Sequence, residues 1–583
     1  MACFKLPNVN VRELNPFTRT VNFFGRLSTN FGWRFVVILL SAYIGVKGIT
    51  SQLTYSAYLP YMRYYVGVVK PTEYQAFYTV SRLPWSLKAT IGMISDAFPI
   101  GGYYKRYYLL GAATLGSIAC AMLAAAPINK IGGGVTAAVL LFVLTLEHAA
   151  VDLLVQGVYA RKMVVRPETG ADLVTAVWVF IMFGNLAASA FVGFFANSHA
   201  TVFFWATLPF AVQVLVPVAI GWLSEDPAPR GFQRAKVHTN RRYFLLGCFM
   251  TVGALGMVPA SLFGSPVVQA AYSIAVSAVL CGSCLLLLPK QIGRAQVYMF
   301  LTSAMNLQIR GALDVFYTGD EKCLPGGPHF DRAFYLAWTA IIGSLFGMLG
   351  VSLFQMILSK RTYRLAFWST TVLQVAAAII DIAIVMRWNL RIGISDKLFY
   401  VLGDSMLQEV IDMMDFMPAV VLTSKLCPIG VESTVYALLA GFSNFGRSVG
   451  SSLGVLALDI AGIKTPKEGA CNFDNLALLL IISHVVLPLL TVPLTFVLIP
   501  KANMTDDLVG GLPMMTDVDK DSSEGSDAGS STSDSEEEKG VDGIAMGVIG
   551  GGGVPMAPGP GVPAVAAPVV ASAPLAADGE VPL

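Results

Sequence analysis

Residues 134–159 read GVTAAVLLFVLTLEHAAVDLLVQGVY, an unbroken apolar run with Glu147, His148 and Asp152 in its interior. A membrane-spanning helix needs about 20 mostly apolar residues, whereas a spanning strand shows only about ten residues of alternating hydrophobicity. The run therefore predicts a spanning helix. Placing an Asp or Arg at the centre of such a helix costs about 2.5 to 3.5 kcal/mol, so a charge there usually marks a functional pathway.

The rest of the chain has the composition of an integral membrane protein. Of its 583 residues, 55% are hydrophobic and only 13% are charged, and the mean hydropathy is +0.64. These values lie outside the range of soluble domains. Apolar windows predict an all-α bundle of about 14 transmembrane helices, with 12 as the alternative. The windows are 33–57, 72–95, 107–126, 134–159, 172–197, 200–223, 243–263, 266–288, 296–318, 333–358, 364–388, 397–424, 432–461 and 474–499.

Loop composition divides the chain and orients it. Lys and Arg concentrate in alternate loops, beginning with the N-terminal segment, so the positive-inside rule places both termini in the cytoplasm. Basic loops on a membrane protein suit an anionic lipid surface rather than nucleic acid. We expect a cytoplasmic N-terminal segment at 1–32, six-helix halves at 33–223 and 296–500, a linker at 224–242, two additional central helices at 243–288, and a disordered tail at 501–583, acidic and then Gly/Pro/Ala-rich.

A short strip after the second window predicts a conformational gate. Gly92 and Asp96 are followed by Lys105 and Arg106, and Lys88 precedes them. This spacing resembles the Gly-x-x-x-Asp loop motif of major facilitator transporters. With the six-two-six grouping, it implies a bundle of that type with extra central helices, in which these five residues serve gating rather than substrate binding.

In such a bundle, the first and fourth helices of each half line a central cavity, and the four predicted spans in those positions carry buried charge. On 296–318, Asn306, Arg310 and Asp314 are expected on one helical face. The pattern suits a polar, hydrogen-bonding and anionic solute. The candidate binding residues are Lys47, Arg82, Asp152, Arg310, Asp314, Asp404, Asp412 and Arg447.

Proton coupling is the second function that the charged spans allow. A carboxylate in a water-poor cavity can take up and release a proton as access alternates. The candidates are Asp152, Asp412 and His148. The alternative reading, that polar side chains only hold helices together by hydrogen bonds, is as good for the Asn, Gln, Ser and Thr residues.

Nothing in the sequence indicates an enzyme, a cofactor or a metal site. Only five His are present, the eight Cys form no ligand cluster, and no Gly-rich loop carries a phosphate-binding Lys. Cys323 and Cys471 both fall on predicted outer loops. Whether they form a disulfide depends on how the spans pack, which the sequence does not give.

Longer strings resemble the folate-biopterin transporter family, and specifically its kinetoplastid members. They include Asp152-Leu153-Leu154-Val155, Arg166-Pro167-Glu168-Thr169-Gly170, Arg310-Gly311-Ala312-Leu313-Asp314, Gly327-Pro328-His329-Phe330 and Leu422-Thr423-Ser424-Lys425-Leu426-Cys427-Pro428. The resemblance implies a plasma-membrane symporter that imports folate or biopterin with protons. One departure is Ala89, where the wider family usually has Pro after the Lys of the gate strip.

Two alternatives remain at this point. Some relatives resemble carriers of S-adenosylmethionine, a cationic solute, so family resemblance does not decide the substrate. A receptor or scaffold that does not transport is the alternative from another functional class. Saturable, pH-sensitive uptake would distinguish a transporter from a scaffold.

Overall fold

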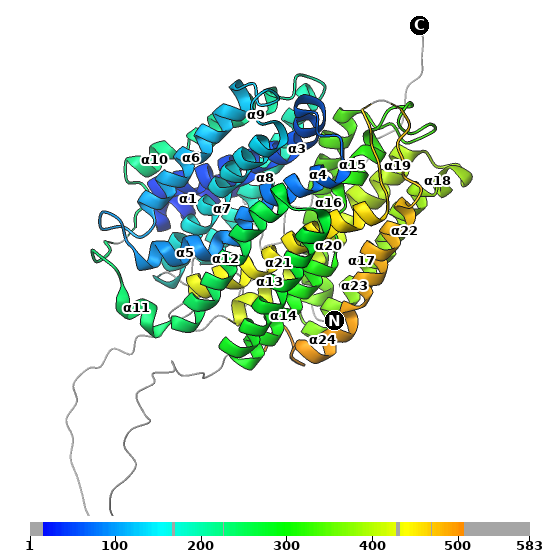
Figure 1. Cartoon of the computed structure of the whole chain (residues 1–583). Helices are drawn as coiled ribbons and strands as arrows, with labels where there is room; N and C mark the ends of the chain where they lie inside the picture. Colours follow the sequence, from blue (N-terminus) through cyan, green and yellow to red (C-terminus); the bar gives the residue numbers. More distant parts are fainter. Residues whose placement is uncertain (1–15, 166–169, 226, 427–431, 468, 507–583) are drawn as a thin grey trace, which may run out of the picture.

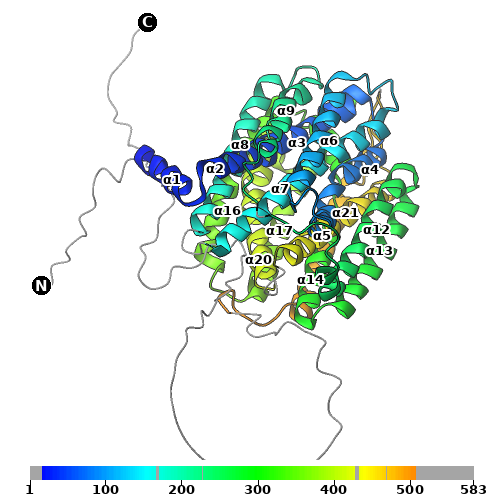
Figure 2. The same cartoon turned by 90° about the vertical axis from the view of Figure 1, so that its left-hand side faces the viewer.

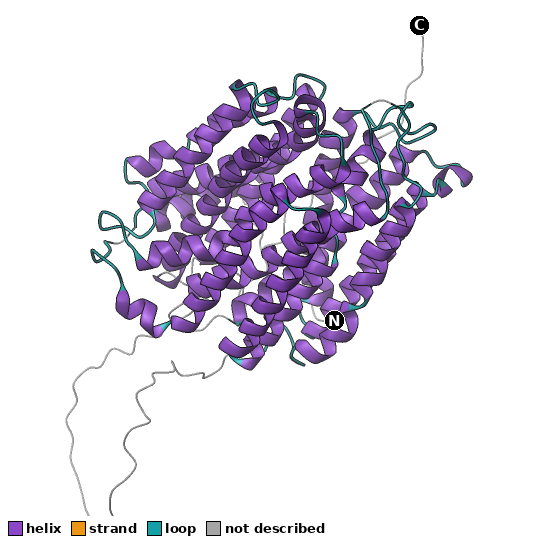
Figure 3. Ribbon diagram, in the orientation of Figure 1, coloured by secondary structure: helices purple, strands orange, loops and turns teal. Residues whose placement is uncertain are grey.

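The computed structural model describes residues 16–165, 170–225, 227–426, 432–467 and 469–506, and in this part of the chain helices are joined by loops and turns, without a strand (Figure 3). The helices lie side by side as a bundle, and α1 projects from its edge (Figure 2). The predicted tail from residue 507 onward lies outside the described residues.

The N-terminal part of the bundle begins with one long rod that changes its helical winding. Residues Trp33–Val66 run without interruption through α2, two π-helical stretches and α3, which is labelled near the top of Figure 1. The elements are α1 (Pro16–Phe31), α2 (Trp33–Leu39), η2 (Leu40–Thr50), α3 (Ser51–Leu59), η3 (Pro60–Val66), α4 (Pro71–Arg82), η4 (Leu83–Leu87), α5 (Lys88–Ala97), α6 (Arg106–Ala125), α7 (Gly133–Val165), α8 (Gly170–Phe195), α9 (Val202–Val212) and α10 (Leu215–Ala219).

A short helix and an antiparallel helix pair follow in the middle of the chain. They are α11 (Arg234–Thr239), α12 (Arg241–Phe263) and α13 (Pro266–Leu287). The pair contacts both ends of the sequence, because α12 packs on α4 and α13 packs on α21.

The C-terminal part repeats the pattern of long helices, several of them interrupted. Its elements are α14 (Lys290–Met305), α15 (Arg310–Thr318), η6 (Phe334–Trp338), α16 (Thr339–Leu353), η7 (Phe354–Leu358), α17 (Tyr363–Val385), α18 (Trp388–Arg391), α19 (Asp396–Tyr400), η8 (Val401–Gln408), α20 (Glu409–Lys425), α21 (Glu432–Ile460), α22 (Leu476–Leu480), η9 (Ile481–Val486), α23 (Leu487–Leu489) and α24 (Thr491–Leu498).

Ten helices in the described part are long and apolar enough to cross a membrane. The other four predicted spans, at 72–95, 296–318, 397–424 and 432–461, are also helical but fall short of that standard. The first is interrupted by a 3₁₀ turn, the second is broken in two, and the last two carry many polar side chains. These are the segments in which the sequence departs furthest from lipid-like composition.

The predicted helix 296–318 is not continuous, which is a correction to the expected row of Asn306, Arg310 and Asp314. The helix ends at Met305 and restarts at Arg310. A glycine on α21 explains the break. A Cβ at Gly450 would lie 2.9 Å from the carbonyl oxygen of Asn306, so only glycine lets α21 pack this closely against the unwound backbone. Arg310 and Asp314 remain one turn apart, and Asn306 belongs to the unwound stretch.

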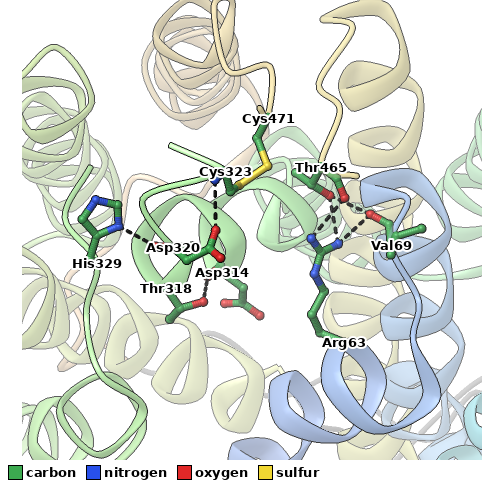
Figure 4. Close-up of a disulfide and its surroundings, with 10 residues drawn as sticks. Arg63, Val69, Asp314, Thr318, Asp320, Cys323, His329, Thr465 and Cys471 are labelled. Carbon is green, nitrogen blue, oxygen red and sulfur yellow. Dashed lines mark hydrogen bonds between the residues drawn. A yellow bond between two sulfur atoms is a disulfide. The ribbon is translucent and has the colours of Figure 1, made fainter. Parts of the chain in front are cut away.

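A disulfide closes one end of the bundle. Cys323, after α15, is bonded to Cys471, after α21, with their Cα atoms 4.7 Å apart (Figure 4). In the same region, the guanidinium of Arg63 donates to Val69 O at 2.7 Å and to Thr465 Oγ1 and O at 3.0 Å each. The disulfide that the sequence left open is therefore present, and at this end η3 is tied to the loop after α21.

Candidate functional site

The first charged cluster joins one carboxylate to two lysines. Lys47 Nζ, from η2, donates to Asp152 Oδ1 at 2.7 Å, and Lys88 Nζ, from the start of α5, donates to Asp152 Oδ2. Their side chains are 25%, 4% and 10% exposed for Lys47, Asp152 and Lys88. The trio has one positive charge in excess. Lys88, which the sequence assigned to the gate, thus lies with the buried charges of α7.

A pocket opens beside this trio, between α3, α4 and α7. Its empty space is about 320 Å³, part of which is open to solvent. The lining residues are Ser51, Thr54, Tyr55, Tyr58, Tyr78, Ser81, Arg82, Leu141, Thr145 and His148. The described lining has hydroxyl, aromatic and basic groups but no acid, so it presents hydrogen-bond donors and positive charge.

The three pocket tyrosines also contact a cation from α15. The guanidinium carbon of Arg310 lies 4.2 Å from the ring centroid of Tyr55, 5.0 Å from that of Tyr78 and 5.7 Å from that of Tyr58. Arg310 Nε donates to Asp314 Oδ2 at 2.8 Å, while Arg310 Nη1 is buried without a hydrogen-bond partner. A cation on aromatic faces with one free N–H group can still donate a hydrogen bond to an anionic ligand atom.

Asp314 of α15 links α4 to η6. It accepts hydrogen bonds from Tyr74 Oη of α4 at 2.6 Å and from Tyr335 Oη of η6 at 2.8 Å, in addition to the bond from Arg310. With three donors on one buried carboxylate, Asp314 is tied into the bundle rather than left open to a ligand.

A ladder of hydrogen bonds aligns α4 and η4 with α21. The bonds join Gln75 Nε2 to Ser451 Oγ at 2.7 Å, Thr79 Oγ1 to Ser451 Oγ at 2.6 Å, Asn444 Nδ2 to Trp85 O at 3.2 Å and Ser86 Oγ to Ser448 Oγ at 3.3 Å. Arg82 lies within the first segment and Arg447 within the second. The two arginines therefore sit at the same level on neighbouring helices, and their charges act on one another.

A second set of carboxylates lies on η8 and α20. Asp412 Oδ1 accepts from Gln408 Nε2 at 2.8 Å and lies 3.5 Å from Gln374 Nε2. Asp404 interacts instead with Tyr400 and Asp381. Asp412 also acts on Arg447. Arg447 thus stands between the basic pocket residues on one side and Asp412 on the other.

The gate strip lies at the opposite end from the disulfide, where it contacts the linker. Lys105 Nζ donates to Asp96 Oδ1 at 2.8 Å, and Lys236 Nζ of α11 lies 3.5 Å from Asp96 Oδ2. Glu225 accepts from the backbone N–H groups of Lys105 and Arg106, although burial raises the pKa of this carboxyl above its usual range.

Gly92 plays a smaller structural part than expected. A Cβ at Gly92 would lie 3.6 Å from a methyl group of Leu153, which is an ordinary contact. Close helix approach occurs elsewhere, where a Cβ at Gly184 would lie 2.8 Å from the Cα of Gly48.

Sequence reasoning missed the aromatic part of the site. Tyr55 and Tyr58 lie three residues apart, next to the predicted polar row that includes Ser51 and Thr54. Helical spacing could have placed them on the cavity wall. Conversely, Glu147, next to His148 in sequence, faces α6 and is fully buried against Gly116.

Comparison with known proteins gives the family and the fold. The model of the BT1 family matches residues 47–510. The chain is 26% identical over 511 residues to the probable folate-biopterin transporter 2 of Arabidopsis thaliana, covering 86% of this chain and 90% of that protein. It is also 26% identical over 462 residues to the folate-biopterin transporter of Synechocystis, covering 78% and 79% of the two chains.

Solved transporters share the architecture. A POT family transporter in complex with 5-aminolevulinic acid matches with a TM-score of 0.56 at 14% identity, covering 82% of this chain and 98% of that one. The nucleoside transporter NupG matches with a TM-score of 0.51 at 13% identity, covering 79% and 99%. The expected all-α bundle of major-facilitator type is confirmed, and these matches speak to fold alone.

Proposed function

This chain belongs to the BT1 family, and on that premise we propose that it is a secondary transporter that carries folate or biopterin across the plasma membrane, driven by protons. Membership in a transporter family confirms the expectation of a multi-pass membrane protein that is not an enzyme. Substrate, coupling ion, membrane and site residues are parts of the proposal.

The observation that carries the proposal is the polar site between the halves. The pocket tyrosines and Arg82, which has no ion pair with a described residue, come from α3 and α4, while Arg310 and Arg447 come from α15 and α21. A site built from both halves can be exposed to either side in turn as the halves rock about it, which is how alternating access works. The halves are 33–223 and 296–500, joined by the linker 224–242 and the pair 243–288.

Each group of site residues has a distinct role in this proposal. Lys47, Arg82, Arg310 and Arg447 attract the anionic part of the substrate, and Arg offers the planar fork that a carboxylate fits. Asp152, Asp314, Asp404 and Asp412 hold these cations or accept N–H groups of the pteridine ring. Asp96, Lys105 and Arg106 act in the gate, with Gly92 and Lys88 near its inner end.

Asp412 is the first residue to test for proton coupling. Asp152 is already bound by two lysines, whereas Asp412 receives only amide donors from Gln408 and Gln374. A carboxylate without a bound cation can gain a proton without releasing an ion pair. His148, which lines the pocket, is the remaining candidate.

The test is uptake of labelled folate and biopterin by purified protein in liposomes with an imposed pH gradient. We expect saturable uptake that the gradient accelerates, and an Asp412→Asn variant whose uptake no longer responds to it. Asp474→Asn, in an exposed loop, is the matched control. Uptake by Asp412→Asn with an unchanged response to pH would refute the proton assignment.

S-adenosylmethionine is the second candidate, and the acids Asp404 and Asp412 are the feature that favours a cation. Competition of the three unlabelled compounds against labelled folate in the same liposomes separates the substrates. The finer form of the proposal is a kinetoplastid-type carrier with both termini in the cytoplasm. Antibody access to tagged termini in intact cells would test the orientation.

A further inference from the structure

Arg82 and Arg447 come from the two predicted halves and act on one another electrostatically, and neither forms a hydrogen bond or an ion pair with a described residue. From this pair we propose how the substrate is oriented. A carboxylate of the substrate lies between Arg82 and Arg447, and the N–H edge of its pteridine ring lies against Asp412. This inference rests on the proposed function and deepens it, because it makes the anionic tail a recognised group.

The first argument is that both arginines are free to bind a ligand. Each side chain is exposed within a helix that packs in the middle of the bundle, and neither forms a hydrogen bond or an ion pair with any described residue. Lys47, Lys88 and Arg310 differ in that each already has an ion pair, Lys47 and Lys88 with Asp152 and Arg310 with Asp314.

Arg82 and Arg447 also lie at the same level of the bundle. The ladder that joins α4 and η4 to α21 has bonds on both sides of the pair, from Thr79 to Ser451 and from Asn444 to the carbonyl oxygen of Trp85. Arg82 and Arg447 therefore share one level and repel each other. A carboxylate between two guanidinium groups replaces this repulsion with two charge-assisted interactions.

The charge of the site changes from basic near Arg82 to acidic near Asp412. The pocket beside Arg82 offers His148, hydroxyls and tyrosine rings but no acid among its described lining residues. Beyond Arg447 lies Asp412 with the amides of Gln408 and Gln374, an array that accepts and donates hydrogen bonds. An anion fits the first region, and the adjacent N–H donors of a pteridine ring fit the second.

Arg82 and Arg447 come from different halves of the bundle, so a ligand that binds both can draw the halves together. A ligand carboxylate that binds both joins the two halves directly, whereas a neutral pteridine binds Asp412 without drawing Arg82 toward Arg447. Ligands with a carboxylate should therefore bind more tightly than the same ring without one. A cationic solute gains nothing from this pair.

Equilibrium binding to the purified full-length protein tests the orientation with three probes: folate has both parts, biopterin has the ring without the carboxylate tail, and p-aminobenzoylglutamate has the tail without the pteridine. Arg82→Gln and Arg447→Gln should each weaken folate and p-aminobenzoylglutamate by about tenfold or more and leave biopterin unchanged. Asp412→Asn should weaken folate and biopterin and spare p-aminobenzoylglutamate.

The control is Arg391→Gln, which removes the same charge from an exposed position on α18 and should change no probe. Melting curves of each variant verify that it is folded. Equal loss of folate and biopterin in the Arg82 and Arg447 variants, or no loss of p-aminobenzoylglutamate, would overturn the orientation. Failure of the unaltered protein to bind any of the three probes would instead count against the proposed function itself.

Discussion

Removing Asp152 should destabilise the fold far more than removing one of the two lysines that bind it. Asp152→Asn leaves two ammonium groups without a counter-charge, and Lys88 is almost completely buried. Removing one partner of a buried ion pair typically costs about 3–5 kcal/mol, a change of about 150- to 4,000-fold in the folding equilibrium. Lys88→Gln should cost about 1 kcal/mol or less, because the remaining pair with Lys47 is neutral and the new amide can still donate to Asp152.

The double variant Asp152→Asn/Lys88→Gln separates this account from a general sensitivity of the site. It leaves only Lys47, which is partly exposed and can be hydrated, so it should recover most of the stability lost in Asp152→Asn. The measurement is thermal melting in one detergent at one protein concentration. The unaltered protein and Lys88→Gln should have the highest melting temperatures, the double variant an intermediate one and Asp152→Asn the lowest. A double variant that melts below Asp152→Asn would refute the electrostatic reasoning.

Three further changes test the frame around the site. Cys323→Ser should lower stability by about 2–4 kcal/mol in oxidising buffer, and a reductant should lower the melting temperature of the unaltered protein but not of the variant. Gly184→Leu should cost at least about 1–3 kcal/mol, because its side chain would overlap the backbone at Gly48, as melting would show. Asp96→Asn should release α11, so trypsin should cut after Lys236 faster than in the unaltered protein.

The Gly184→Leu and Asp96→Asn predictions each have a control in which the same type of residue is changed elsewhere. Gly111→Leu adds the same side chain where nothing lies within 4 Å and should melt normally. Glu73→Gln breaks an exposed ion pair with Lys70 and should not alter cleavage at the linker. Equal destabilisation by both leucines would contradict the close-packing argument, and unchanged cleavage of Asp96→Asn would contradict the role of its carboxylate in holding α11.

The sequence predicted the helical class because long apolar runs allow few other structures in lipid. Charge within those runs also located Lys47, Asp152 and Arg310 near the site, because a buried charge needs a partner and the partners are themselves charged. These inferences rest on local composition, which a single chain displays fully.

Features that depend on a neighbouring helix could not be predicted in this way. The break before Arg310 exists because Gly450 on α21 packs against the backbone there, and the attachment of Lys88 to Asp152 joins α5 to α7. The role of Tyr55 follows from its contact with Arg310, which lies on a different helix. Pairings across the bundle are set by tertiary packing rather than by periodicity.

The bond between Cys323 and Cys471 gives the bundle a chemical polarity. Such bonds endure in oxidising surroundings and are lost in the reducing cytosol. If the bond persists in the living cell, the end that bears it faces away from the cytosol and the end that bears Lys105 faces inward. A reductant unable to cross lipid, applied from outside, would then reach this bond in intact cells and report the direction in which the carrier is inserted.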